Sequence, residues 1–100
     1  MSKGPTGPTL RVGQLVYSRA GRDRGRPFLV WDILSPRRIL LVDGKLRRVA
    51  KPKPKNILHV QPVNRWAEDI ALKRDRGESV SDAEVRRAIA RLVGEEENLP

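Results

Sequence analysis

Four arginines lie within the eight residues of segment 19–26. The same segment contains Gly21 and Gly25 and a single acidic residue, Asp23. Glycine lets the backbone turn tightly, and the guanidinium fork of arginine matches the oxygens of a phosphate group. Contacts of this kind position a nucleic acid without reading its sequence. The segment therefore predicts a phosphate-binding loop, and the alternative is a solvated turn whose charges only keep the protein soluble.

A second basic segment, residues 47–55, has lysine alternating with proline. The prolines favour an extended, polyproline-like path that leaves the chain fewer conformations to lose on binding. We expect its lysines to lie along the edge of a nucleic-acid groove, and the alternative is a stiff, solvated connector. The basic residues of this segment are Arg47, Arg48, Lys51, Lys53 and Lys55.

The net charge of the whole chain also favours a polyanionic partner. The 100 residues include 21 Lys and Arg against 12 Asp and Glu, which makes the formal net charge +9. Residues 1–62 contain 14 basic and three acidic residues, whereas residues 63–100 contain seven basic and nine acidic ones. A charge so far from neutral favours a nucleic acid or a membrane surface as partner and predicts no fold. We therefore expect residues 1–62 to bind the partner.

The sequence offers little support for catalysis or for a metal site. It has no cysteine and a single histidine, His59, so neither a disulfide nor a metal site is expected. Gly25 is followed by Arg26 and Pro27 in place of the Lys-Ser/Thr pair of a nucleotide-binding P-loop. Because no two carboxylates are placed as general acid and base, we expect no enzymatic activity, no catalytic residue and no cofactor. His59 is either a structural residue of a strand or an RNA contact, and the sequence leaves both readings open.

The apolar residues are distributed in short runs. None approaches the ~18 residues of a membrane-spanning helix, and the N-terminus has no secretory signal, so we expect a cytoplasmic protein without membrane contact. Residues 1–9 are rich in Gly, Pro, Thr and Ser and are expected to form a disordered leader. Four aromatic residues are too few for the stacking platforms of single-strand binders, so structured RNA is favoured.

Short apolar runs separated by Gly, Pro and Asp predict an all-β unit over residues 10–62. Asp43-Gly44 predicts a type I′ hairpin turn between the third and fourth strands. Five strands in about 50 residues are too few for a sandwich, so we expect a small barrel. The strands are expected at residues 14–18, 28–34, 38–42, 46–49 and 57–60.

Residues 63–100 predict a helical hairpin with an acidic tail. The first helix is expected to begin after Asn64 as N-cap, and the two helices are expected to pack on the barrel through Trp66, Ile70, Ile89 and Leu92. Residues 81–84 form a capping box at the start of the second helix, and Gly94 predicts a left-handed end. Since this part is slightly acidic, we expect it to contact a protein rather than RNA.

Residues 13–30 resemble a KOW motif, with Gly25 at the position of the hallmark glycine. Residues 43–49, 51–53 and 56–62 resemble the branch that contains archaeal and eukaryotic large-subunit ribosomal protein fourteen and its small bacterial relatives, and the chain is identified as such a bacterial relative. The resemblance implies a mainly β fold with a helical tail (α+β): a five-stranded SH3-like barrel of the KOW type followed by the hairpin. It also implies contact with ribosomal RNA. We further expect a monomer, with a ribosomal protein as neighbour of the hairpin.

The implied function is binding of ribosomal RNA in the large subunit, as a structural component or as an assembly or quality-control factor. The alternative is a protein-interaction module of the transcription or translation machinery, and DNA binding is a third reading. The resemblance and the basic loops together predict these RNA-binding residues: Ser18, Arg19, Gly21, Arg22, Arg24, Gly25, Arg26, Arg47, Arg48, Lys51, Lys53, Lys55, Asn56 and His59.

Overall fold

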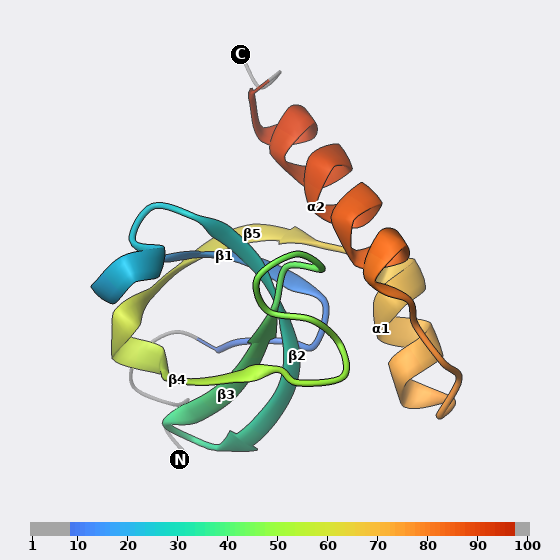
Figure 1. Cartoon of the computed structure of the whole chain (residues 1–100), viewed down its shortest axis with the longest axis horizontal. Coiled ribbons are helices and arrows are strands. Elements are labelled where there is room, and N and C mark those ends of the chain that lie inside the picture. Colours follow the sequence, from blue (N-terminus) through green and yellow to red (C-terminus); the bar gives the residue numbers. More distant parts are fainter. Residues whose placement is uncertain (1–8, 98–100) are drawn as a thin grey trace, which may run out of the picture.

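The computed structural model describes residues 9–97, and residues 1–8 of the expected leader and residues 98–100 lie outside the described part. Figure 1 shows a small curled sheet with two helices on its outside. The elements, in chain order, are β1 (Gln14–Ser18), the 3-10 helix η1 (Gly21–Asp23), β2 (Pro27–Ser35), β3 (Arg38–Val42), β4 (Lys53–Asn56), the 3-10 helix η2 (Ile57–His59), β5 (Val60–Trp66), α1 (Glu68–Asp75) and α2 (Asp82–Glu97).

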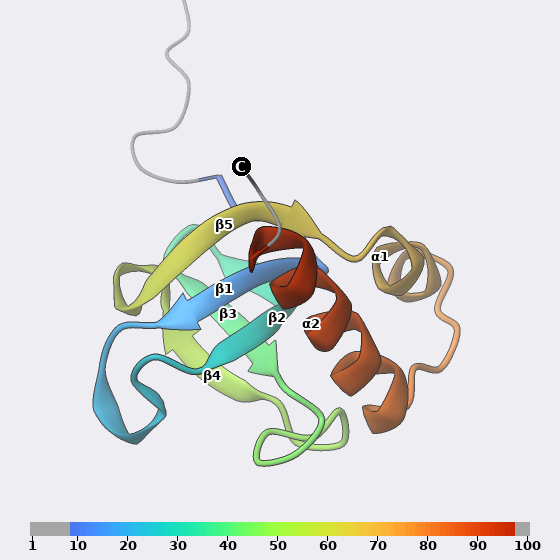
Figure 2. The same cartoon turned by 90° about the horizontal axis from the view of Figure 1, so that it is seen from above.

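The five strands form one sheet in the order β4-β3-β2-β1-β5, and each neighbouring pair is antiparallel. Two register shifts interrupt the pairing of β2 with β3, and one interrupts the pairing of β1 with β5. Such bulges increase the local bend and twist of a strand, which lets so short a sheet curl. In Figure 2 the edge strands β4 and β5 lie on opposite sides of the curl. The predicted fold class, a mainly β, five-stranded SH3-like barrel with a helical tail, is confirmed.

The centre of the sheet is buried on both faces, which explains the continuous apolar run of β2. The inner face holds a cluster of Val16, Phe28, Val30, Ile39, Leu41 and Val60. On the outer face, three sheet residues pack against the helical hairpin in a cluster of Leu15, Leu29, Val42, Ala67, Ile70, Val80, Val85, Ala88, Ile89 and Leu92. The hairpin therefore shares a core with the sheet, and the expected boundary between residues 62 and 63 lies inside β5.

The prediction of a fourth strand at residues 46–49 is wrong, and so is the type I′ turn. Gly44 has a φ of +78°, but no residue other than glycine has a positive φ in the described part of the chain, whereas this turn needs two positive φ angles. The Asp43 carboxylate instead accepts hydrogen bonds from the backbone N–H groups of Lys45 and Arg47, at 2.9 and 2.8 Å. These bonds hold residues 43–47 in a compact loop.

The segment expected to be a polyproline-like connector contains β4, so that prediction is corrected. Lys53, Pro54 and Lys55 pair with β3 at the edge of the sheet. An edge strand accepts proline because one of its sides needs no amide donors. The prediction of a strand at residues 57–60 is also wrong for residues 57–59, which form η2. This turn forms because the Asn56 side chain accepts a hydrogen bond from the Leu58 N–H at 2.8 Å.

Both helices differ from the prediction at one end. Pairing with β1 extends β5 to Trp66, so Asn64 is a strand residue, and α1 begins only at Glu68. The Ser81 hydroxyl accepts the predicted capping bond from the Glu84 N–H at 3.1 Å, whereas the Glu84 carboxylate accepts from Lys73 Nζ at 2.9 Å, so the first half of the predicted capping box is present. The second helix does not end at Gly94 but continues to Glu97.

The extension of α2 past Gly94 has a tertiary cause. The Tyr17 hydroxyl donates a hydrogen bond of 2.8 Å to Glu96, so β1 holds the last turn of the helix. Burial, followed by the hydrogen bond and the charge of Glu96, raises the pKa of Tyr17 to about 12.

Of the helices in residues 9–97, none is long and apolar enough to cross a membrane.

Candidate nucleic-acid interface

The two basic segments, which are distant in sequence, meet in the structure. Arg47 Nη2 lies 3.0 Å from Asp23 Oδ2, and Lys55 Nζ donates to the Ala20 carbonyl oxygen at 3.3 Å. In Figure 2 the β1–β2 loop and the β3–β4 loop extend along the same lower side of the barrel. We call the cations of these loops and of the adjoining strand β4 that have no carboxylate partner in residues 9–97 the basic face: Arg19, Arg22, Arg24, Arg26, Lys45, Arg48, Lys51, Lys53 and Lys55.

The cations of the basic face have no carboxylate partner within residues 9–97, and seven of the nine residues are exposed. The two acidic residues of these loops, Asp23 and Asp43, are buried, with 5% and 8% of their surface exposed. Asp43 accepts backbone hydrogen bonds, and Asp23 is paired with Arg47. The solvent side of both loops therefore presents positive charge alone.

The first loop is closed by backbone hydrogen bonds around Gly25. The Gly25 N–H donates to the Ser18 carbonyl at 2.8 Å, and the Ser18 N–H donates to the Arg26 carbonyl at 3.0 Å. Gly25 and Gly21 have φ angles of +83° and +76°, a conformation that favours glycine. The Ser18 side chain is buried and donates to the Ala20 carbonyl at 3.0 Å. Ser18 and the two glycines thus shape the loop from which the arginines extend, and their contact with RNA stays a prediction.

The second loop is held by the start of α2, a contact that sequence reasoning missed. Asp82 Oδ1 accepts a hydrogen bond from the Val49 N–H at 2.9 Å, and Arg86 Nη1 donates to the Gly44 carbonyl at 2.7 Å. A Cβ atom on Gly44 would collide with the Asp82 carbonyl oxygen and with Arg86 Cγ. The helical hairpin therefore positions part of the basic face. Because each of these contacts joins residues more than 30 positions apart, no local sequence pattern predicts them.

A hollow of about 550 Å³ lies on the outside of the second loop. Four basic residues and no carboxylate line it, so it suits the phosphates of a nucleic-acid backbone. Its lining consists of Leu46, Arg47, Arg48, Lys51, Pro52, Lys53 and Pro54. Arg47 already donates two hydrogen bonds to Asp23, so this predicted RNA contact also ties the two loops together.

His59 lies beside the first loop, and Asn56 precedes it at the start of η2. The His59 carbonyl accepts a hydrogen bond from the Arg19 N–H at 2.7 Å, and Asn56 caps η2. The His59 side chain is exposed and belongs to η2, so it is not the packed strand residue of one reading. Contacts thus join the two segments that contain most of the predicted RNA-binding residues, and His59 contacts the first loop, whereas the Ser18 side chain is buried.

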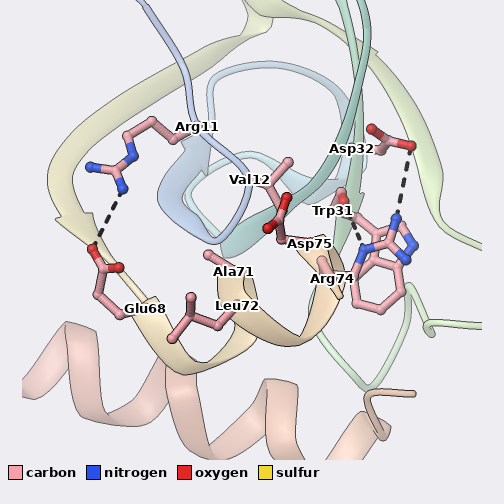
Figure 3. Close-up of a pocket in the computed structure, with 9 residues that line it drawn as sticks. All are labelled: Arg11, Val12, Trp31, Asp32, Glu68, Ala71, Leu72, Arg74 and Asp75. Atoms are coloured by element: carbon pink, nitrogen blue, oxygen red, sulfur yellow. Dashed lines mark hydrogen bonds and ion pairs between the residues drawn. The ribbon is translucent and has the colours of Figure 1, made fainter. Parts of the chain in front are cut away.

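Two further cations, Arg11 and Arg74, lie beside α1 and differ from those of the basic face. Arg74 is stacked on Trp31 at 4.0 Å from the ring centroid and lies 3.8 Å from the Asp32 carboxylate. Arg11 is paired with Glu68 at 3.5 Å across the hollow of about 530 Å³ shown in Figure 3. Because carboxylates neutralise both arginines, this hollow offers no free positive charge for a phosphate.

The prediction that Trp66 attaches α1 to the barrel is wrong. Its ring lies 4.3 Å below the Arg11 guanidinium, and its Nε1 donates to Glu68 at 2.8 Å. The other three predicted packing residues, Ile70, Ile89 and Leu92, do lie in the cluster that the hairpin shares with the sheet. In the described part of the chain no three His, Cys, Asp or Glu residues are grouped to hold a metal ion.

Comparison with known proteins supplies relatives among archaeal ribosomal proteins. Large ribosomal subunit protein eL14 of Desulfurococcus amylolyticus is 32% identical over 82 residues, which cover 82% of this chain and 78% of the relative. The eL14 protein of Staphylothermus marinus is 31% identical over 83 residues, covering 83% and 79%. That of Sulfolobus acidocaldarius is 26% identical over 82 residues, covering 82% and 78%.

No protein-family model matches the chain, so the KOW motif and the bacterial placement stay predictions. The similarity to two archaeal proteins nevertheless exceeds 30% identity and covers more than three quarters of each relative. The chain therefore belongs to the family of the large ribosomal subunit protein eL14.

Proposed function

We propose that the protein binds ribosomal RNA in the large ribosomal subunit through the basic face and catalyses no reaction. One observation carries the proposal: nine cations without a carboxylate partner in residues 9–97 gather on strand β4 and on the two loops that Asp23 and Arg47 join. Free arginine and lysine side chains bind phosphate oxygens and release counterions from the nucleic acid. The names of the relatives, all large ribosomal subunit proteins, support the ribosome as the place of binding.

The finer parts of the proposal concern partners and location. We propose a cytoplasmic monomer that serves as a structural component or as an assembly or quality-control factor. The helical hairpin faces a ribosomal protein, because its near-neutral surface has little attraction for phosphate. The alternative of a module for proline-rich peptides is disfavoured, since arginines cover the rings of Trp31 and Trp66, and such modules display exposed aromatic clusters.

Sedimentation of ribosomal subunits from a cell lysate tests the proposal. The wild-type protein should sediment with the large subunit at low salt and be released as salt rises, because phosphate contacts weaken with ionic strength. The double variant Arg22→Ala/Arg24→Ala should be released at lower salt. Arg76→Ala/Arg87→Ala, which removes two exposed arginines of the hairpin, is the matched control.

Three results would contradict the proposal. Absence of the wild-type protein from the large subunit at every salt concentration would remove the ribosome as its location. Equal losses in the two double variants would mean that only the total charge matters. Preferential binding to a DNA duplex over ribosomal RNA of equal length would favour the DNA-binding reading.

A further inference from the structure

A second hollow, of about 290 Å³, lies between α2 and the two basic loops. Its lining combines an apolar part with a charged rim. The apolar part consists of Pro27, Ile89, Ala90 and Val93, and the rim of Arg26, Asp43, Lys45 and Arg86. This volume is near the lower end of the range for small-ligand sites, about 300 Å³, and therefore suits a single flat group.

The rim offers free positive charge but no free negative charge. The buried Asp43 carboxylate accepts two backbone hydrogen bonds, and Arg86 donates to the Gly44 carbonyl. Arg26 and Lys45 are exposed and form no ion pair within residues 9–97. A ligand that fits would thus place an uncharged, flat group against α2 and an anionic group beside Arg26 and Lys45.

An apolar lining in this place needs an explanation. Ala90 is exposed on α2, and Val93 beside it is only partly buried, although both border loops that otherwise present cations. A phosphate backbone alone needs no apolar surface. A nucleotide whose base is turned out of the helix needs an apolar surface for the base and cations for the phosphates, because the base leaves water while its phosphates stay paired with cations.

We infer that this hollow binds one unpaired base of the RNA, and the inference rests on the proposed function. A regular RNA helix keeps its bases stacked inside and its major groove too narrow for side chains, whereas bulges and loops release bases that proteins bind individually. The hollow is continuous with the basic face through Arg26 and Lys45, which favours RNA over a protein segment as its occupant. The protein therefore prefers RNA with a bulged nucleotide over fully paired RNA.

Two RNA hairpins test this inference. They share one stem, and one of them has a single bulged 2-aminopurine, whose fluorescence changes when it leaves the stack. Affinity is measured at one fixed salt concentration because the phosphate contribution depends on salt. The wild-type protein should bind the bulged hairpin about tenfold more tightly, because one face of the base leaves water against the apolar lining.

The variant Ala90→Leu fills the hollow from the exposed surface of α2. It should abolish the preference for the bulged hairpin and the fluorescence change, while its affinity for the paired hairpin and its melting temperature stay the same. Ala50→Leu is the matched control, because Ala50 is an exposed alanine of the second loop that lines neither hollow. This control should keep the preference.

The outcomes separate the inference from the proposed function. If the wild type binds both hairpins equally with a steep salt dependence, the base site is wrong and the basic face stands. If it binds neither hairpin nor ribosomal RNA, the proposed function itself fails. If Ala90→Leu keeps the RNA preference but binds the large subunit more weakly, the hollow binds a protein segment and the inference is overturned.

Discussion

Arginine has two different roles on two sides of this molecule. On the basic face, Arg22 and Arg24 are exposed and have no carboxylate within reach in the described structure. Beside α1, Arg11 and Arg74 lie over tryptophan rings and are paired with Glu68 and Asp32. The difference lies in the neighbours: the acidic residues of the basic loops point inward, whereas those of α1 and β2 meet the arginines at the surface.

This difference shows that formal charge alone does not mark a binding surface. A stacked and paired arginine stabilises the fold but offers little to a phosphate, because its guanidinium already has an anion. Arg22 and Arg24 form no such pair and remain available to a partner, and Arg24 Nε donates only to the Arg19 carbonyl at 3.2 Å. The predictions below test that distinction in order of decreasing effect.

The largest contrast is expected in RNA binding. Arg22→Ala/Arg24→Ala should lower the affinity for ribosomal RNA roughly fiftyfold to a hundredfold at about 0.1 M salt and flatten the slope of log K against log salt by about 2 units, if each arginine meets one phosphate. Arg11→Ala/Arg74→Ala should leave the slope unchanged, since both cations are neutralised. Filter binding over a salt series measures both the affinity and the slope. An equal change of slope in the two double variants would mean that free and paired arginines do not differ in RNA binding.

The second contrast lies within the basic face, between its two loops. Gly44→Ala should destabilise the protein by about 1–3 kcal/mol more than Gly25→Ala, because both glycines have positive φ angles but only Gly44 lies against α2. Gly25 has open space where a Cβ would lie, so only the backbone strain of about 1–2 kcal/mol is expected there. Urea unfolding followed by circular dichroism measures the difference, and equal losses would mean that α2 does not hold the second loop.

A smaller effect is expected at the stacked arginine. Arg74→Ala should destabilise the protein by about 1 kcal/mol, since the cation–π contact and the partly exposed ion pair with Asp32 are both modest. The fluorescence of Trp31 should change as its ring becomes exposed. Arg87→Ala, an exposed arginine of α2, serves as control and should alter neither quantity. A full loss of stability in Arg74→Ala would show that this stack is part of the core.

The smallest effect at neutral pH is expected at Tyr17, and this effect decreases in alkali. The pKa of Tyr17 is about 12 in the folded protein against an ordinary value of 10.0, so folding favours the neutral phenol. This stabilisation is fully present below pH 10 and is lost as the pH rises through 12. Tyr17→Phe should cost about 1 kcal/mol or less at pH 8 and should be relatively less destabilising near pH 12. Unfolding free energies measured at both pH values check this, and a constant difference would contradict the shift.

Local chemistry was sufficient to predict much of the fold. The bounds of β1 and β3 and the Ser81 capping bond of α2 were predicted as observed, because strand alternation and capping act over a few residues. The lysine-proline segment was misread for a related reason: proline disfavours a strand locally, but the open edge of the sheet tolerates it. The false strand at residues 46–49 fails because Asp43 binds the loop backbone through its side chain.

The sequence by itself determined the class of fold, the sign of the charge and its concentration in the first 62 residues, since each of these follows from residue type and local order. Only the tertiary structure decided which cations are free. Asp23 and Arg47 are 24 positions apart, and Arg86 is 42 positions from Gly44, so neither contact follows from local periodicity. Whether an arginine is neutralised depends on such distant neighbours, because an ion pair forms through space at a few ångströms and not along the chain.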